Sequence, residues 1–190
     1  ITKENSLVCG SETGWDYFVP VCDYFEGMLS LGLYRCDDSG RNMEQIIEIP
    51  PAQITKVQVN EYYRLPLWEL VYHDCCVAMW YWGDYNNKMP SVWKKRDLFN
   101  ALYAVPPMYM FTLTSLGRNI DAFAQSYKIS SDIVKSTAGI AMTNHEYLTQ
   151  DRTVQKTTFA NGIEVIVNFG KKDFVYQNKT IPAETAKMNF

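Results

Sequence analysis

Carboxylate, histidine and tryptophan side chains gather at two places in the chain where a short apolar run ends. Ser11-Glu12 follows the run 7–10 and leads into Trp15-Asp16, and His73-Asp74 follows the run 65–72. Hydrolysis of a glycosidic bond needs two carboxyl groups that flank the anomeric carbon, and aromatic rings pack on the C–H faces of a sugar. These residue types therefore favour a carbohydrate site.

Glu12 is the candidate acid/base in such a site. A glutamate beside a tryptophan has a raised pKa where desolvation disfavours its charged form, and Trp15 follows Glu12 closely. Asp74 or Asp84 would be its partner or would bind sugar hydroxyls. The alternative is a purely structural role, in which Glu12 caps a helix or pairs with a surface lysine. The candidate substrate-binding residues are Trp15, Asp16, His73, Asp74, Trp80, Trp82 and Asp84.

Other chemistries fit the sequence less well. His73-Asp74 could hold the metal of a phosphohydrolase, but such sites need further histidines and the only other one is His145. Cys75 or Cys76 as a nucleophile beside His73 is disfavoured, because adjacent residues of a strand point to opposite faces. The main non-enzymatic alternative is a sugar-binding module that uses its tryptophans and needs no carboxylate pair.

The composition indicates a globular chain with an aromatic surface or cleft. Its 190 residues are 47% hydrophobic and 14% aromatic, which is enough for one good core. The formal net charge of -3 and the lack of a large basic cluster argue against a nucleic-acid partner. No apolar run approaches the roughly 18 residues typical of a membrane span. The five cysteines form no C-x-x-C pair, and Cys9, Cys75 and Cys76 are interpreted as small core residues.

The middle of the chain predicts alternating strands and helices. The run 65–72 is typical of a strand buried on both faces, and the strand ends of a barrel converge on its active site. A helix is predicted from Ser91, with apolar residues on one face and Lys94–Asp97 mostly on the solvent face. A strand at 108–113 and a helix at about 117–127 follow. This order favours parallel β/α units.

The last part of the chain predicts a small antiparallel β module. Asn161-Gly162 lies between two alternating stretches, 153–159 and 163–169, and is a strong hairpin signal because both residues tolerate positive φ. Gln177-Asn178 predicts a second turn. The boundary is placed near residue 145, which divides the chain into 1–145 and 146–190.

Several of these motifs together resemble the later barrel region of bacterial glycoside hydrolases of family 129 and their family 101 relatives. The resemblance covers nearly the whole chain, and its most specific parts are Tyr72–Asp84 and Arg96–Tyr103. The stretch from Asp151 to Gly170 resembles the β domain that follows such barrels. The fold class that the resemblance implies is α/β: the closing part of a (β/α)8 barrel followed by a small antiparallel β domain.

The resemblance also implies a function: a retaining enzyme that acts on α-linked N-acetylgalactosamine, or a similar sugar, of mucin-type O-glycans. Glu12 matches the acid/base of the family, and the nucleophilic aspartate would lie upstream of Ile1 with the remainder of the barrel. The 190 residues alone would then be an inactive fragment of a longer enzyme. A divalent cation such as calcium is a candidate cofactor by family analogy, although no ligand spacing indicates one. The implied location is bacterial, secreted or periplasmic.

Overall fold

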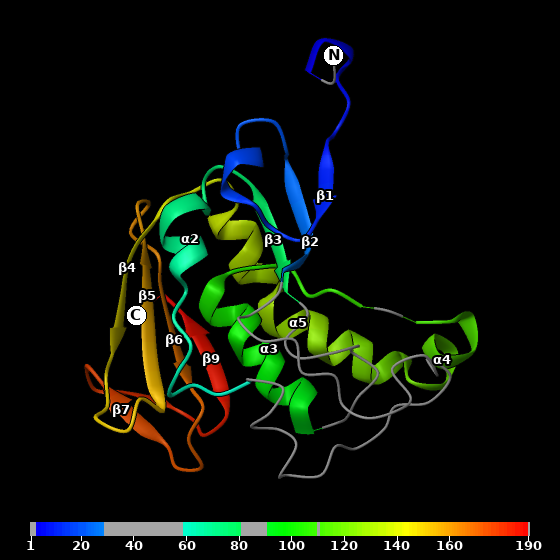
Figure 1. Ribbon diagram of the computed structural model, residues 1–190. Coiled ribbons are helices and arrows are strands. Elements are labelled where there is room, and N and C mark those ends of the chain that lie inside the picture. The colour runs from blue at the N-terminus through cyan, green and yellow to red at the C-terminus, as the bar shows by residue number, and fades with distance from the viewer. Residues whose placement is uncertain (1–2, 29–58, 81–90, 110, 190) are drawn as a thin grey trace.

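The computed structural model describes residues 3–28, 59–80, 91–109 and 111–189. Helices α3 and α5 lie side by side near the middle, with a parallel sheet on one side and an antiparallel sheet on another (Figure 1). The fold is therefore a mixed α/β arrangement. No helix in the described ranges has the length and apolar character that a membrane span requires.

The first sheet contains three short parallel strands. They are β1 (Gly10–Glu12), β2 (Tyr24–Met28) and β3 (Val77–Trp80), in the order β1-β2-β3. Gly10 lies opposite Tyr24, and Tyr24 lies opposite Val77, so all three strands begin at one edge of the sheet and end at the other. Parallel strand pairing was predicted, and it is confirmed for these strands. Two 3-10 helices, η1 (Lys3–Asn5) and η2 (Asp16–Phe18), flank β1.

Four α-helices are described: α2 (Leu67–Tyr72), α3 (Ser91–Tyr103), α4 (Leu113–Arg118) and α5 (Ile120–Thr137). Helix α3 packs against α5 and against the antiparallel sheet. The predicted helix from Ser91 is confirmed, and its apolar face supplies Leu98, Phe99 and Leu102 to the core. The helix predicted at 117–127 is two helices, because the chain turns at Asn119 between α4 and α5.

The second sheet is antiparallel, with the order β4-β5-β6-β9. Its strands are β4 (Met142–Tyr147), β5 (Val154–Phe159), β6 (Glu164–Asn168) and β9 (Thr185–Met188), and a separate hairpin joins β7 (Phe174–Tyr176) to β8 (Lys179–Ile181). Both predicted hairpins are confirmed. Gly162 has a φ of +83° in the first turn, which glycine adopts without strain.

One hydrophobic cluster joins the helices to both sheets. It includes Phe25 of β2, Phe99 and Leu102 of α3, and Phe159 and Val165 of the antiparallel sheet. A smaller cluster of Val154, Ile166 and Ile181 fills the other face of the antiparallel sheet, beneath β7 and β8. The division near residue 145 stays a prediction, although the larger cluster continues across it.

Several predicted elements are wrong. The run 65–72 contains the helix α2 rather than a strand: Leu67 and Val71 are exposed while Glu69 is buried, the pattern of a helix with one face covered. A short apolar run fits either element, so periodicity alone does not decide. Residues 108–109 and 111–112 form no strand, and Leu113 begins α4 after the capping residue Thr112. The strand at the start of the chain is Gly10–Glu12, so it includes Glu12.

The predicted environments of four polar residues are also corrected. Arg96 and Asp97 are buried rather than on the solvent face, because α5 covers that side of α3. Cys75 is exposed and Cys9 is partly exposed, whereas Cys76 is buried as predicted.

Candidate functional site

Two glutamates are register partners near the ends of the parallel strands β1 and β2. Glu12 is the last residue of β1, and its register partner on β2 is Glu26. Paired residues of adjacent strands point to the same face, and neighbouring strands lie about 4.8 Å apart. Both glutamates are exposed. The carboxyl ends of parallel strands are where α/β folds place their ligand sites, so this edge is the candidate site.

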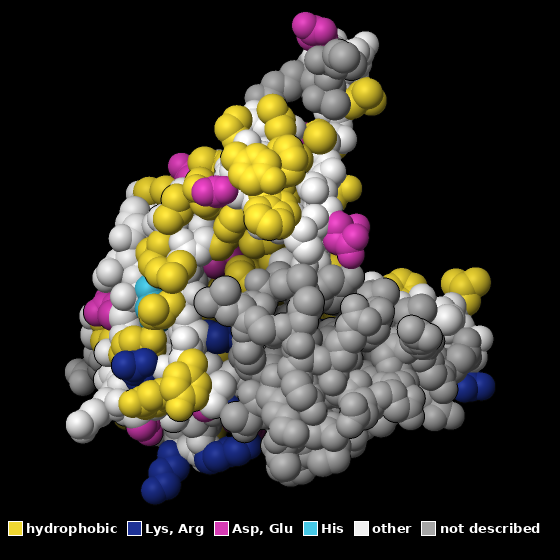
Figure 2. All heavy atoms as spheres, viewed as in Figure 1, with side chains coloured by type: hydrophobic (Ala, Val, Ile, Leu, Met, Phe, Trp, Pro, Cys, Tyr) yellow, Lys and Arg dark blue, Asp and Glu magenta, His cyan; other side chains and the backbone are white. Residues whose placement is uncertain are grey.

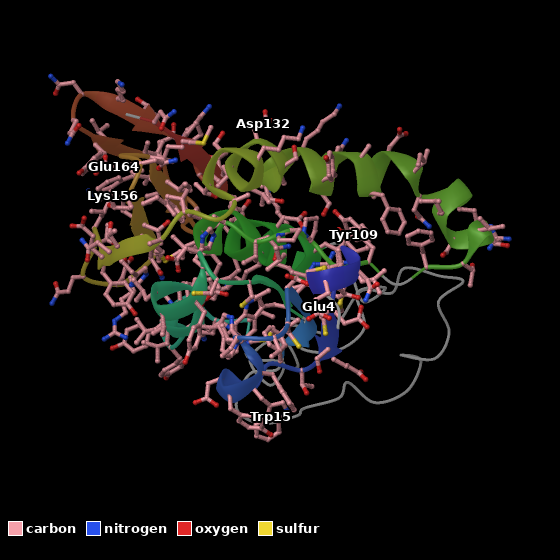
Figure 3. The ribbon with its side chains drawn as sticks, turned by 90° about the horizontal axis from the view of Figure 1, so that it is seen from above. Glu4, Trp15, Tyr109, Asp132, Lys156 and Glu164 are labelled. Carbon is pink, nitrogen blue, oxygen red and sulfur yellow. The ribbon has the colours of Figure 1, made fainter. Side chains whose placement is uncertain are left out.

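The connection after β1 carries exposed aromatic rings. Trp15 is 54% exposed. The centroid of its ring lies 6.0 Å from that of Tyr17, and the Tyr17 centroid lies 4.5 Å from that of Phe18. Figure 3 shows Trp15 at the periphery, directed away from the body of the molecule, and in Figure 2 apolar side chains gather over this part of the chain. The rings are thus available to the flat face of a sugar.

Asp16 and Gly14 fix the shape of this connection. The Asp16 carboxylate accepts a hydrogen bond of 2.9 Å from the backbone N–H of Tyr17, at the start of η2. A Cβ on Gly14 would lie 2.4 Å from the sulfur at the flexible end of Met28 and 3.1 Å from the Trp68 ring, so a larger residue there would require the Met28 side chain to move. The loop that follows Glu12 is therefore packed against β2 and α2.

His73 and Asp74 do not join Glu12. They follow α2 and precede β3, so they lie at the edge where the parallel strands begin, while Glu12 lies where they end. The expected convergence of these residues is wrong, because the segment that His73 ends is a helix. Asp74 is exposed and accepts a hydrogen bond from the Cys75 thiol at 3.4 Å.

His73 has structural partners on both ring nitrogens. Nδ1 lies 2.7 Å from the carbonyl oxygen of Ile140 and Nε2 lies 3.2 Å from that of Ala104. The ring also packs against Phe159, at 5.0 Å between centroids. His73 thus ties the end of α2 to the ends of α3 and α5. His145, the second candidate ligand for a metal, lies on β4 and hydrogen-bonds Gln155 at 2.8 Å.

Trp80 is half-buried and pairs with a glutamate that the sequence did not single out. Its indole N–H donates a hydrogen bond of 2.7 Å to Oε1 of Glu69, which is 2% exposed. Burial raises the pKa of Glu69 to about 8, opposed by the hydrogen bond from Trp80 and by the charge of Arg64. A glutamate with a raised pKa beside a tryptophan therefore exists in the fold, but it is enclosed. Trp82 and Asp84 lie outside the described residues.

A second polar network lies between α3 and α5. The Tyr109 hydroxyl donates to Ser126 at 2.5 Å, and the Ser126 hydroxyl donates to Asp97 at 2.6 Å. The Arg96 guanidinium lies 4.9 Å from the centre of the Trp93 ring. Burial raises the pKa of Asp97 to about 6, opposed by Arg96 and by Ser126. The helical spacing of the sequence gave no signal for this network.

A further polar cluster and an apolar pocket lie elsewhere. Lys156 contacts Glu146 and Glu164, each at 2.9 Å, and Figure 3 shows Lys156 and Glu164 together on the side of the molecule away from Trp15. An apolar pocket with an empty volume of about 350 Å³, partly open to solvent, is lined by Glu69, His73 and Ala104 among others. It lies where β3 begins, so it is separate from the edge that carries Glu12.

The described residues contain no cluster of the side chains that most often bind a metal ion. Within that part of the chain, no three histidine, cysteine, aspartate or glutamate side chains come together in a way that could hold one.

Solved structures with the same fold include the α-N-acetylgalactosaminidase NagBb from Bifidobacterium bifidum. A quadruple mutant of that enzyme matches with a TM-score of 0.58 and 18% identity, over 96% of this chain and 24% of that one. Its GalNAc complex matches with a TM-score of 0.57 and 18% identity, over 96% and 25% of the two chains. The chain thus spans about a quarter of the length of NagBb. A search of curated proteins gives no match.

The family model described as "Glycosyl hydrolases related to GH101 family, GH129" matches residues 31–158, which is more than half of the chain. The match confirms the resemblance that the sequence motifs indicated. The chain belongs to the GH129 family of glycosyl hydrolases.

Proposed function

We propose that the chain is part of a retaining glycosidase that removes α-linked N-acetylgalactosamine, or a similar sugar, from mucin-type O-glycans. Membership of GH129 supports glycosidase chemistry, and the likeness in fold to an α-N-acetylgalactosaminidase supports the sugar. The observation that carries the proposal is the position of Glu12, exposed at the carboxyl end of a parallel strand.

Glu12 acts as the acid/base in this proposal. As an acid it protonates the leaving oxygen, and as a base it activates the water that releases the sugar from the enzyme. The nucleophile is an aspartate upstream of Ile1, in the remainder of a (β/α)8 barrel that the parallel sheet helps to close. Trp15 packs on the sugar and Asp16 accepts hydrogen bonds from its hydroxyls. The 190 residues alone hold only part of this site and are inactive.

Glu26 is the second carboxylate at the strand edge. Its strand register with Glu12 places it next to the acid/base, where it binds a sugar hydroxyl. Asp74 has no part in this site, because it lies at the opposite edge of the sheet. Because a glycan substrate of this kind is met outside the cell, the proposed location is the periplasm or the secreted proteins of a bacterium.

The test compares two variants of the full-length protein, Glu12→Gln and Glu26→Gln. Loss of a general acid slows a reaction by roughly 10²–10⁴-fold and matters most for poor leaving groups. Glu12→Gln is therefore expected to cleave α-N-acetylgalactosaminyl serine far more slowly, with a much smaller loss for an activated aryl glycoside. Glu26→Gln is expected to lose activity on both to the same degree. If Glu12→Gln leaves the ratio of the two rates unchanged, Glu12 is not the acid.

The second candidate function is a non-catalytic sugar-binding module. The exposed rings of Trp15, Tyr17 and Phe18 favour it, because they form a binding face without any carboxylate pair. The full-length protein decides between the two candidates when it is incubated with an α-N-acetylgalactosaminyl serine substrate. Release of reducing sugar supports the glycosidase, and binding without release supports the module.

A further inference from the structure

Cys9 and Cys22 hold their thiols in contact. Cys9 directly precedes β1, and Cys22 lies two residues before β2. Their sulfur atoms are 4.0 Å apart. A disulfide bond needs about 2.05 Å between the sulfurs, so side-chain rotation has to bring them only about 2 Å closer. Among the four cysteines that the structure describes, these are the two whose sulfurs contact each other.

The backbone around the two cysteines is fixed by hydrogen bonds. The N–H of Asp23 donates to the carbonyl oxygen of Cys9 at 2.7 Å, and the N–H of Cys9 donates to the Asp23 carboxylate at 2.8 Å. The N–H of Tyr24 also donates to the Cys9 carbonyl, at 3.3 Å. The two thiols therefore meet because the start of β1 is bound to the segment that enters β2, and not through a chance contact of mobile loops.

We propose that Cys9 and Cys22 are a disulfide-forming pair that closes the connection from β1 to β2 into a covalent ring. The ring contains residues 9–22 and so includes Glu12, Trp15 and η2. The proposal concerns the covalent state of the chain and does not depend on the proposed function.

The oxidant is a small-molecule disulfide such as oxidised glutathione. The partly exposed Cys9, as its thiolate, attacks one sulfur of the oxidant; the S–S bond of the oxidant breaks and one glutathione thiolate leaves. Cys22, as its thiolate, then attacks the Cys9 sulfur of the mixed disulfide and releases the second glutathione thiolate. The two cysteines lose two electrons and two protons in total, and the oxidant becomes two molecules of reduced glutathione.

The other described cysteines are less suited to this chemistry. The Cys75 thiol donates a hydrogen bond to the Asp74 carboxylate. The Cys76 thiol is buried and donates to the carbonyl oxygen of Tyr72, and burial raises the pKa of Cys76 to about 11. Burial and the contact with Cys9 also raise the pKa of Cys22, so the step in which Cys22 attacks is faster at higher pH.

Peptide mapping of the full-length protein tests the pair. The protein is incubated with oxidised glutathione, unfolded under acid quench and alkylated with N-ethylmaleimide. Trypsin cleaves after Lys3 and Arg35, so one peptide contains both cysteines. We expect this peptide to be two hydrogens lighter than its reduced form, with alkylation at least about tenfold lower than in a reduced sample. Further cleavage before Asp16 and Asp23 should leave the fragments that contain Cys9 and Cys22 joined until they are reduced.

Three serine variants make the result decisive. Cys75→Ser is the matched control and should keep the link between Cys9 and Cys22. Cys9→Ser should leave Cys22 open to alkylation in the same oxidised sample, and Cys22→Ser provides the reciprocal check if Cys9→Ser does not fold. Full alkylation of both cysteines after oxidation, or a link from Cys22 to Cys36 or Cys76, would overturn the proposal.

Discussion

The pH dependence of stability should change when Glu69 is replaced by glutamine. The Glu69 side chain is enclosed beside Trp80, and burial raises its pKa from 4.5 to about 8. Between these values the folded state holds a proton that the unfolded state has released, so the free energy of unfolding falls as pH rises. Glutamine has nearly the same shape, still accepts the Trp80 hydrogen bond and does not titrate. Glu69→Gln should therefore lack this part of the pH dependence.

The magnitude follows from the separation of the two pKa values. Each pH unit between them costs about 1.4 kcal/mol, so wild type should lose about 3 kcal/mol relative to Glu69→Gln between pH 5.5 and 7.5. The two proteins should be similar in stability at pH 5.5, because Oε2 of Glu69 has no hydrogen-bond partner in the described structure and the glutamine amide meets the same surroundings. Above pH 5.5 the variant should therefore become progressively more stable than wild type.

Urea unfolding followed by tryptophan fluorescence measures the difference. Full-length wild type and Glu69→Gln are unfolded at a series of pH values, with Asp132→Asn as the control because Asp132 is exposed and pairs only distantly with Lys135. The free energy of unfolding of the control should change with pH in the same way as that of wild type. If the free energies of unfolding of wild type and Glu69→Gln change equally between pH 5.5 and 7.5, the reasoning is refuted. Glu69 would then have the same pKa in the folded and the unfolded state.

Two further variants test the interior contacts. Ser126→Ala removes the hydroxyl that donates to Asp97, so we expect a loss of roughly 1.5–3 kcal/mol in urea unfolding at pH 8, where Asp97 is charged. The loss should be smaller at pH 4.5, where Asp97 is protonated, and an equal loss at both pH values would contradict the assigned role. Thr157→Val leaves the Leu102 carbonyl without its donor and should lower Tm through a loss of about 1–3 kcal/mol, whereas Thr180→Val at an exposed position should not.

The hairpins and the long helix could be predicted from the sequence because their signals are local. Asn161-Gly162 supplies a turn whatever surrounds it, and the apolar face of residues 91–103 repeats with the period of a helix. The run 65–72 gave no such signal, since its apolar residues face both solvent and core. A helix of six residues is too short for its period to be recognised.

The position of Glu12 at a strand end could be predicted, but its neighbours could not. Glu26 lies next to Glu12 because of the register between β1 and β2. That register depends on how the two strands pair, which the sequence of one strand does not specify. Arg96 and Asp97 look like part of a solvated charge run until α5 is placed over them. The burial of Glu69 depends in the same way on tertiary packing, because its partner Trp80 lies on the following strand, β3.

The larger hydrophobic cluster has a consequence for how the chain can be divided. Phe99 of α3 packs against Phe169 at 4.7 Å between ring centroids, and the Thr157 hydroxyl donates to Leu102, so α3 and the antiparallel sheet share one interior. A protein cut near residue 145 would present the sheet's inner face, with Val165 and Phe159, to water on one piece and the matching side of α3 on the other. Neither piece should form a folded, monomeric protein on its own, and mixing the two pieces should restore a folded complex.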